Sequence, residues 1–103
     1  MNKFFFLLLL FASNKAEAQT SALAIASKAI EENPDNERAW YERAIAADSY
    51  YKDLETRLNY YQAYLNKYED AGYSELVYLA KRRIKDIREE IHLAVEERDT
   101  VAN

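Results

Sequence analysis

The sequence predicts an all-α protein, built from short antiparallel helical hairpins and a long closing helix at the C-terminus. Of its 103 residues, 50% are hydrophobic, yet only one is Gly and one is Pro, so few positions interrupt a helix. Apolar residues recur at intervals of three and four, which is the spacing of helices with one buried face. Pro34 cannot continue a helix and Asn36 can cap the next one, so Asn33-Pro34-Asp35-Asn36 indicates a tight turn between two helices.

The N-terminal residues have the pattern of a targeting segment and are expected to lie outside the folded domain. Lys3 precedes a continuously apolar run over residues 4–12, and Ala16-Glu17-Ala18 has the small-residue arrangement of a cleavage site. The apolar run is too short to span a bilayer comfortably. We therefore predict a secretory signal peptide over residues 1–18, cut after Ala18, with an uncleaved N-terminal anchor as the alternative. The absence of Cys excludes a lipoprotein and fits a periplasmic or secreted bacterial protein.

The folded domain is expected over residues 19–99 and opens with two amphipathic helices. The first covers about residues 20–32, and the small residues of its apolar stripe let a partner helix approach closely. The second covers about residues 37–52 and gathers larger apolar side chains on one face. The two stripes consist of Ala22, Leu23, Ala26, Ala29 and Ile30, and of Trp40, Ala44, Ala47 and Tyr51.

Two further helices complete the domain. Asp53 can cap a third helix over about residues 54–68, and Gly72 suits the helix exit or a tight loop. Ser74 can cap a last helix over about residues 75–98, after which residues 100–103 are expected to fray. The stripe of the third helix has 4-3-4-3 spacing and consists of Leu54, Leu58, Tyr61, Leu65 and Tyr68.

The last helix carries an apolar seam at strict heptad positions. The seam consists of Val77, Ala80, Ile84, Ile87, Ile91 and Ala94. It can cover the end of the preceding helices, which is the use we favour. It can instead pair with the seam of a second copy as a coiled coil, so the sequence leaves a closing role and self-association both open.

A repeat is visible around the predicted turn. Pro34 and Glu69 each follow one amphipathic helix and precede another, and their separation of 35 residues is close to the 34-residue period of helix–turn–helix repeats. With Trp40 and Ala44 placed in the helix after Pro34, the chain resembles the tetratricopeptide repeat family, in particular repeats of bacterial envelope proteins such as outer-membrane assembly factors. The likeness spans residues 21–90, about one and a half repeats.

The resemblance implies a way of binding. The first helices of such repeats line a concave groove that holds an extended peptide or a helix of a partner. The corresponding positions here are Arg38, Tyr41, Ile45 and Asp48, which the resemblance makes candidate partner-binding residues. These residue types do not support the carboxylate clamp of Lys and Asn that some family members have. The sequence also departs from the family at Arg43, where Leu is usual.

Catalytic and metal-binding patterns are weak. The chain has no Cys, a single His and no Gly-rich phosphate loop, so nucleophilic catalysis and nucleotide binding have no support. Glu89 and His92 have the spacing of a di-iron ligand pair, and Glu96 extends the row, but no second such motif exists and these residues point away from the seam. We therefore predict no enzyme, no metal and no cofactor. The net charge of −4 argues against a nucleic-acid partner, although Lys81, Arg82, Arg83, Lys85 and Arg88 form a short basic run.

The function expected from these patterns is binding of another protein. The favoured form is an exported interaction module that holds a peptide or helix of an envelope protein in a groove of the tetratricopeptide type. The alternative is a small structural helical protein, a homodimer that self-associates through Val77, Ile84, Ile87 and Ile91. The nine Tyr leave both forms open, because they can pack a core or form a partner surface.

Overall fold

The computed structural model describes residues 14–102, with side chains described for residues 21–99. This part of the chain folds into four helices and contains no strand, which confirms the predicted all-α class. The helices are α2 (Asn14–Glu32), α3 (Glu37–Tyr50), α4 (Leu54–Tyr68) and α5 (Ser74–Ala102). The apolar run of the predicted signal peptide lies outside the described residues.

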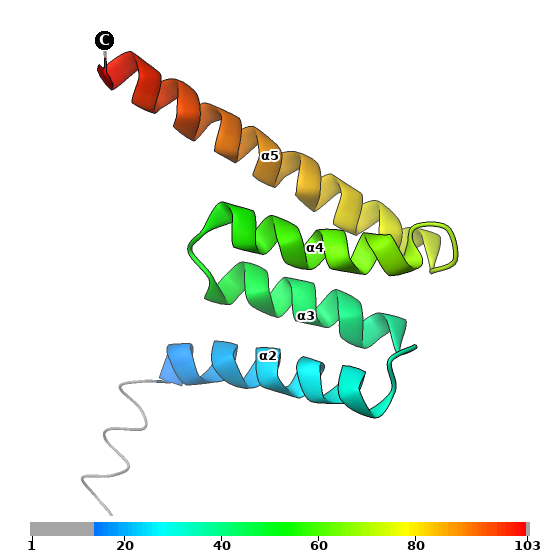
Figure 1. Ribbon diagram of the computed structural model, residues 1–103. Helices are drawn as coiled ribbons and strands as arrows, with labels where there is room; N and C mark the ends of the chain where they lie inside the picture. The colour runs from blue at the N-terminus through cyan, green and yellow to red at the C-terminus, as the bar shows by residue number, and fades with distance from the viewer. Residues whose placement is uncertain (1–13, 103) are drawn as a thin grey trace, which may run out of the picture.

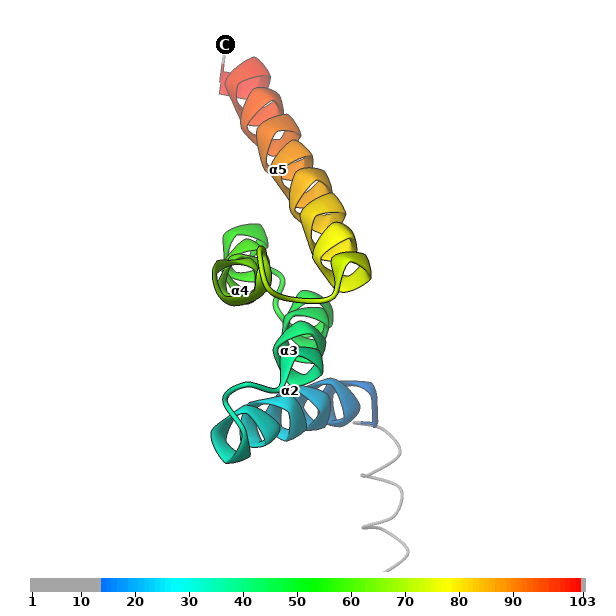
Figure 2. The same cartoon turned by 90° about the vertical axis from the view of Figure 1, so that its right-hand side faces the viewer.

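Successive helices pack side by side, α2 on α3, α3 on α4, and α4 on α5. Figure 1 shows α2, α3 and α4 as a stack of antiparallel helices, with α5 running diagonally along the side of the stack opposite α2. The C-terminal half of α5 extends past the end of the α3–α4 hairpin (Figures 1 and 2). The fold is therefore a short array of hairpins in which α2 packs on α3, and α5 packs chiefly on α4 with further contacts to α3.

The interior helix boundaries follow local capping. The Asn36 side chain accepts a hydrogen bond from the Ala39 amide at 3.2 Å, and Asp53 accepts from the Thr56 amide at 3.1 Å, as the sequence predicted for both caps. The bounds of α4 agree with the prediction. Helix α3 ends at Tyr50, two residues before the predicted end, and the Tyr51 amide closes it by donating to the Ala47 carbonyl.

The outer helices are longer than the sequence indicated. Helix α2 begins at Asn14 rather than near residue 20, so it is continuous through the predicted cleavage site. Helix α5 starts at Ser74, one residue early, because the Tyr73 carbonyl already accepts from the Val77 amide. It then continues to Ala102, through the residues that were expected to fray.

The core lies where α3, α4 and α5 meet, and tyrosines fill much of it. Tyr64 and Ile87 are the largest side chains fully removed from solvent. The cluster consists of Ala44, Tyr61, Tyr64, Leu65, Tyr68, Val77, Ala80, Ile84 and Ile87. Small residues at Ala44 and Ala80 leave room for the tyrosine rings, which explains how three helices bury such bulky groups.

The predicted turn is fastened to α4. The Asn33 side chain accepts from the Asp35 amide at 3.1 Å, and the Trp40 indole donates to the Pro34 carbonyl at 2.8 Å. Lys67 of α4 donates to the same carbonyl, and its ammonium lies 4.9 Å from the centre of the Trp40 ring. The turn is thus held by the Lys67 side chain, which lies more than thirty residues later in the chain. The turn sets how α2 and α3 lie against each other.

Candidate interaction surfaces

An apolar groove of about 510 Å³ lies between α2 and α3. Its walls are Ala22, Ile25 and Ala26 from α2 and Ile45 and Ala46 from α3, with Glu42 and Ser49 at the rim. Ile25 is 70% exposed and Ile45 is 42% exposed, so the two largest apolar groups of the groove face solvent. Small residues between them would let the backbone of a second chain approach closely. This arrangement can hold an apolar helix or peptide.

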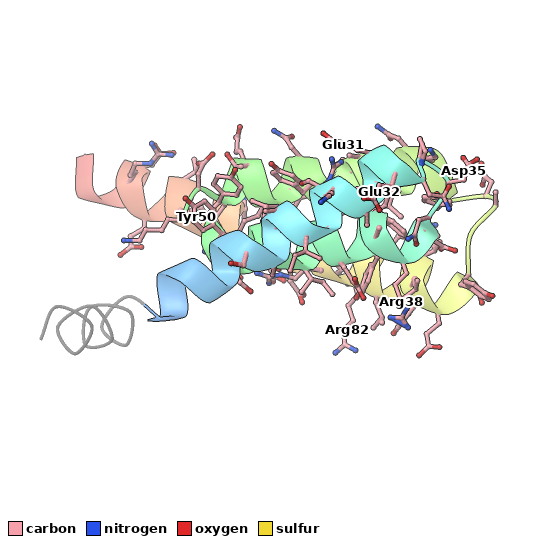
Figure 3. The ribbon with its side chains drawn as sticks, turned by 90° about the horizontal axis from the view of Figure 1, so that it is seen from below. Glu31, Glu32, Asp35, Arg38, Tyr50 and Arg82 are labelled. Carbon is pink, nitrogen blue, oxygen red and sulfur yellow. The ribbon has the colours of Figure 1, made fainter. Side chains whose placement is uncertain are left out.

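The structure separates the four partner-binding residues that the resemblance implied. Ile45 lies in the groove, and Arg38 lies on the same helix with its side chain 73% exposed and a contact of 3.8 Å to Glu42. Figure 3 shows Arg38 projecting from α3 on the side of the molecule away from Glu31. Tyr41 is half-buried, and its ring meets the Tyr64 ring edge to face at 5.6 Å. Burial raises the pKa of the Tyr41 hydroxyl.

Asp48 serves the fold rather than an open groove. Its carboxylate receives two hydrogen bonds from the Arg83 guanidinium, at 2.7 and 3.0 Å, and one from the Tyr61 hydroxyl at 2.9 Å. Partial burial opposes ionisation of Asp48, but the hydrogen bonds from Arg83 and Tyr61 and the charges of Arg83 and Arg57 outweigh it and lower the pKa. The side chain is 15% exposed and joins α3, α4 and α5, while the partner-binding role expected for Asp48 stays a prediction.

Glu37 makes a second link at the opposite end of the same helices. Its carboxylate accepts from the Tyr64 hydroxyl at 2.6 Å and from the Tyr73 amide at 2.9 Å. A Cβ at Gly72 would stand 2.3 Å from the Glu37 carboxylate. No residue in the described chain has a positive φ, so the backbone conformation at Gly72 does not itself require glycine. Gly72 therefore lies in a tight loop as predicted, but the reason is the close carboxylate and not a left-handed backbone.

The tyrosines divide between core and surface. Tyr61, Tyr64 and Tyr68 are buried, and the Tyr68 hydroxyl has no hydrogen-bond partner among the described residues. Burial, reinforced by the bonds to Asp48 and Glu37, raises the pKa values of Tyr61 and Tyr64 well above the ordinary range. The exposed tyrosines are Tyr50, Tyr73 and Tyr78.

Arg43 packs against two aromatic rings of the described chain. Its guanidinium lies 4.7 Å from the centre of the Trp40 ring and 5.4 Å from that of Tyr60. A cation above two aromatic faces covers them much as an apolar side chain would. Neither the sequence spacing nor the resemblance pointed to this contact.

The heptad seam of α5 is largely occupied within the chain. Val77, Ile84 and Ile87 are buried in the core, and Ile91 packs partly against it. Beyond that point every described side chain of α5 is exposed, including Leu93 at 56% and Val95 at 39%. In this fold the first part of the seam lies against α4, and the last turns of the helix have no covering element among the described residues.

Within residues 14–102, no helix is long and apolar enough to cross a membrane. The same part of the chain holds no group of three or more His, Cys, Asp or Glu side chains arranged to bind a metal ion. His92 and Glu96 contact each other at 3.2 Å on the exposed surface of α5. Comparisons with protein-family models, curated proteins and solved structures found no match to the chain.

Proposed function

We propose that the chain is an exported, non-enzymatic interaction module that holds a helix or extended peptide of an envelope protein in the groove between α2 and α3. The observation that supports this proposal is the uncovered apolar lining, in which Ile25 and Ile45 face solvent. In groove binding of this kind, the bound helix presents apolar anchors at helical spacing to an apolar lining. The resemblance to tetratricopeptide repeats also implies groove binding, although Ile45 is the one of its four candidate residues that lines this groove.

The exposed apolar surface of the lining limits the binding free energy that the groove can supply. Complete burial of an isoleucine side chain contributes about 1.5–3 kcal/mol, and these two side chains are already partly covered. Covering both would contribute about 2–3 kcal/mol, which falls short of stable binding alone. A partner must therefore also contact the polar rim, where Glu42 and Ser49 offer hydrogen-bonding groups.

The test is a pair of matched surface substitutions. Ile25→Ser with Ile45→Ser removes the apolar side chains of the groove, whereas Leu79→Ser removes an apolar side chain on α5 that is 38% exposed, about as exposed as Ile45. After mild cross-linking in the producing cell, quantitative mass spectrometry compares the proteins captured by each variant. We expect the groove variant to lose proteins that the Leu79 variant retains, with unchanged helical circular dichroism. Equal capture by both variants would contradict the proposal.

The proposed export has its own test. Mass spectrometry of the protein purified from its producing cell gives the N-terminal residue. Signal cleavage after Ala18 would leave Gln19 first. A mass that includes residues 1–18 would instead favour the uncleaved anchor, and a cytoplasmic fraction of the uncut chain would refute export.

A further inference from the structure

The charges of α5 are divided between its two halves. Residues 81–88 contain five basic side chains and one acidic side chain, a net charge of +4. Residues 89–99 contain five acidic side chains and one Arg, a net charge of −4 with His92 neutral. The same helix is therefore strongly positive where it packs on α4 and strongly negative where it extends past the hairpin (Figure 1).

The positive half borders a groove of about 390 Å³ between α4 and α5. Leu65 and Ile84 contribute apolar surface to it, and the basic side chains Lys81, Lys85 and Arg88 line it. Lys81 contacts Glu69 at 3.1 Å. Neither Lys85 nor Arg88 has a carboxylate within ion-pair distance in the described part of the chain. The groove thus offers two uncompensated cations beside an apolar floor.

The negative half has the complementary properties. From His92 to Asp99 every side chain is exposed, and Leu93 and Val95 are apolar groups without cover in this fold. A helical segment that packs against nothing is marginally stable in water, because most helix stability in proteins comes from tertiary packing. A basic groove with an apolar floor would supply the missing contacts.

We propose that two copies of this chain associate through antiparallel α5 helices, so that the acidic half of each lies in the basic groove of the other. A two-fold axis beside Glu90 would place Lys81 of one copy opposite Asp99 of the second, and Lys85 opposite Val95 and Glu96. A parallel pair would instead set like charges side by side, which is unfavourable. This surface is distinct from the α2–α3 groove, and the two proposals do not depend on each other.

Charge reversal tests the pairing directly. Sedimentation equilibrium of the full chain is measured for the natural sequence, for K81E/K85E, for E96K/D99K and for the combination of all four substitutions. We expect the natural chain to dimerise with a dissociation constant that rises with salt. Each double variant should weaken the dimer about a hundredfold or more, since two like-charged contacts form at each of the two symmetry-related grooves. The fourfold variant should restore it.

A matched control and an orientation test complete the design. K28E/K52E makes the same change in net charge on exposed lysines outside α5 and should leave the dimer unaffected. Because the chain has no Cys, a single Ser74→Cys substitution reports orientation. An antiparallel dimer keeps the two introduced thiols apart, and a disulfide between copies would overturn the proposal. A natural chain that stays monomeric at every concentration, or a dimer whose dissociation constant is unchanged by K81E/K85E, would also overturn it.

Discussion

Replacing Asp48 by Ala should destabilise the protein substantially, because this carboxylate joins three helices. The substitution leaves the Tyr61 hydroxyl without its acceptor in a residue that is 3% exposed, which costs about 1–3 kcal/mol. Arg83 also loses two hydrogen bonds, but its side chain is 30% exposed and regains water, so this loss adds only about 0.5–1 kcal/mol. We expect a total loss of about 1.5–4 kcal/mol in the free energy of unfolding.

Urea unfolding followed by circular dichroism measures this loss, with Asp70→Ala as the control for an exposed carboxylate. The folded state lowers the pKa of Asp48, so its stabilisation is present above the unfolded pKa of about 4 and disappears as the pH falls through the folded value. The gap between the natural chain and Asp48→Ala should therefore narrow below pH of about 4. Equal stability of the Asp48 and Asp70 variants at neutral pH would refute the reasoning.

Other substitutions test the second link. Gly72→Ala should lower the free energy of unfolding by about 1–2 kcal/mol. The added Cβ would stand 2.3 Å from the Glu37 carboxylate and displace it from the Tyr64 hydroxyl and the Tyr73 amide. An unchanged melting temperature would argue against this loss of stability. Tyr64→Phe keeps the ring but removes the bond to Glu37, and should cost about 1 kcal/mol in urea unfolding. The raised pKa of Tyr64 means that its stabilisation is present below the unfolded pKa of about 10 and is lost as the pH rises further. Ultraviolet titration should accordingly show Tyr61 and Tyr64 ionising at a pH above the ordinary range of a tyrosine hydroxyl, and ionisation of these two residues within that range would contradict the burial.

Local chemistry explains how far the sequence alone predicts this fold. Helical spacing, the turn at Pro34 and the caps at Asn36 and Asp53 depend on residues within one or two turns, and the structure has each of them. The apolar seam of α5 was visible for the same reason, since its period belongs to a single helix.

Contacts between distant residues were beyond such patterns. The resemblance to tetratricopeptide repeats implied a groove position for Asp48 and gave no sign that its carboxylate contacts Arg83, which lies 35 residues later. The sequence also did not predict that α2 begins at Asn14 and that α5 continues to Ala102. The residues near Asn14 were interpreted as a cleavage site, and the residues near Ala102 were expected to fray.

The sequence by itself determined the helices, their order and the turn that folds α2 back on α3. Only the tertiary structure decided which polar groups join the helices and which apolar groups stay exposed. Glu37 and Asp48 look like ordinary surface charges on α3, but packing brings the hydroxyls of Tyr64 and Tyr61 against them. The physical reason is that helical periodicity gives the direction of a side chain about its own axis, while its partner depends on how the axes cross.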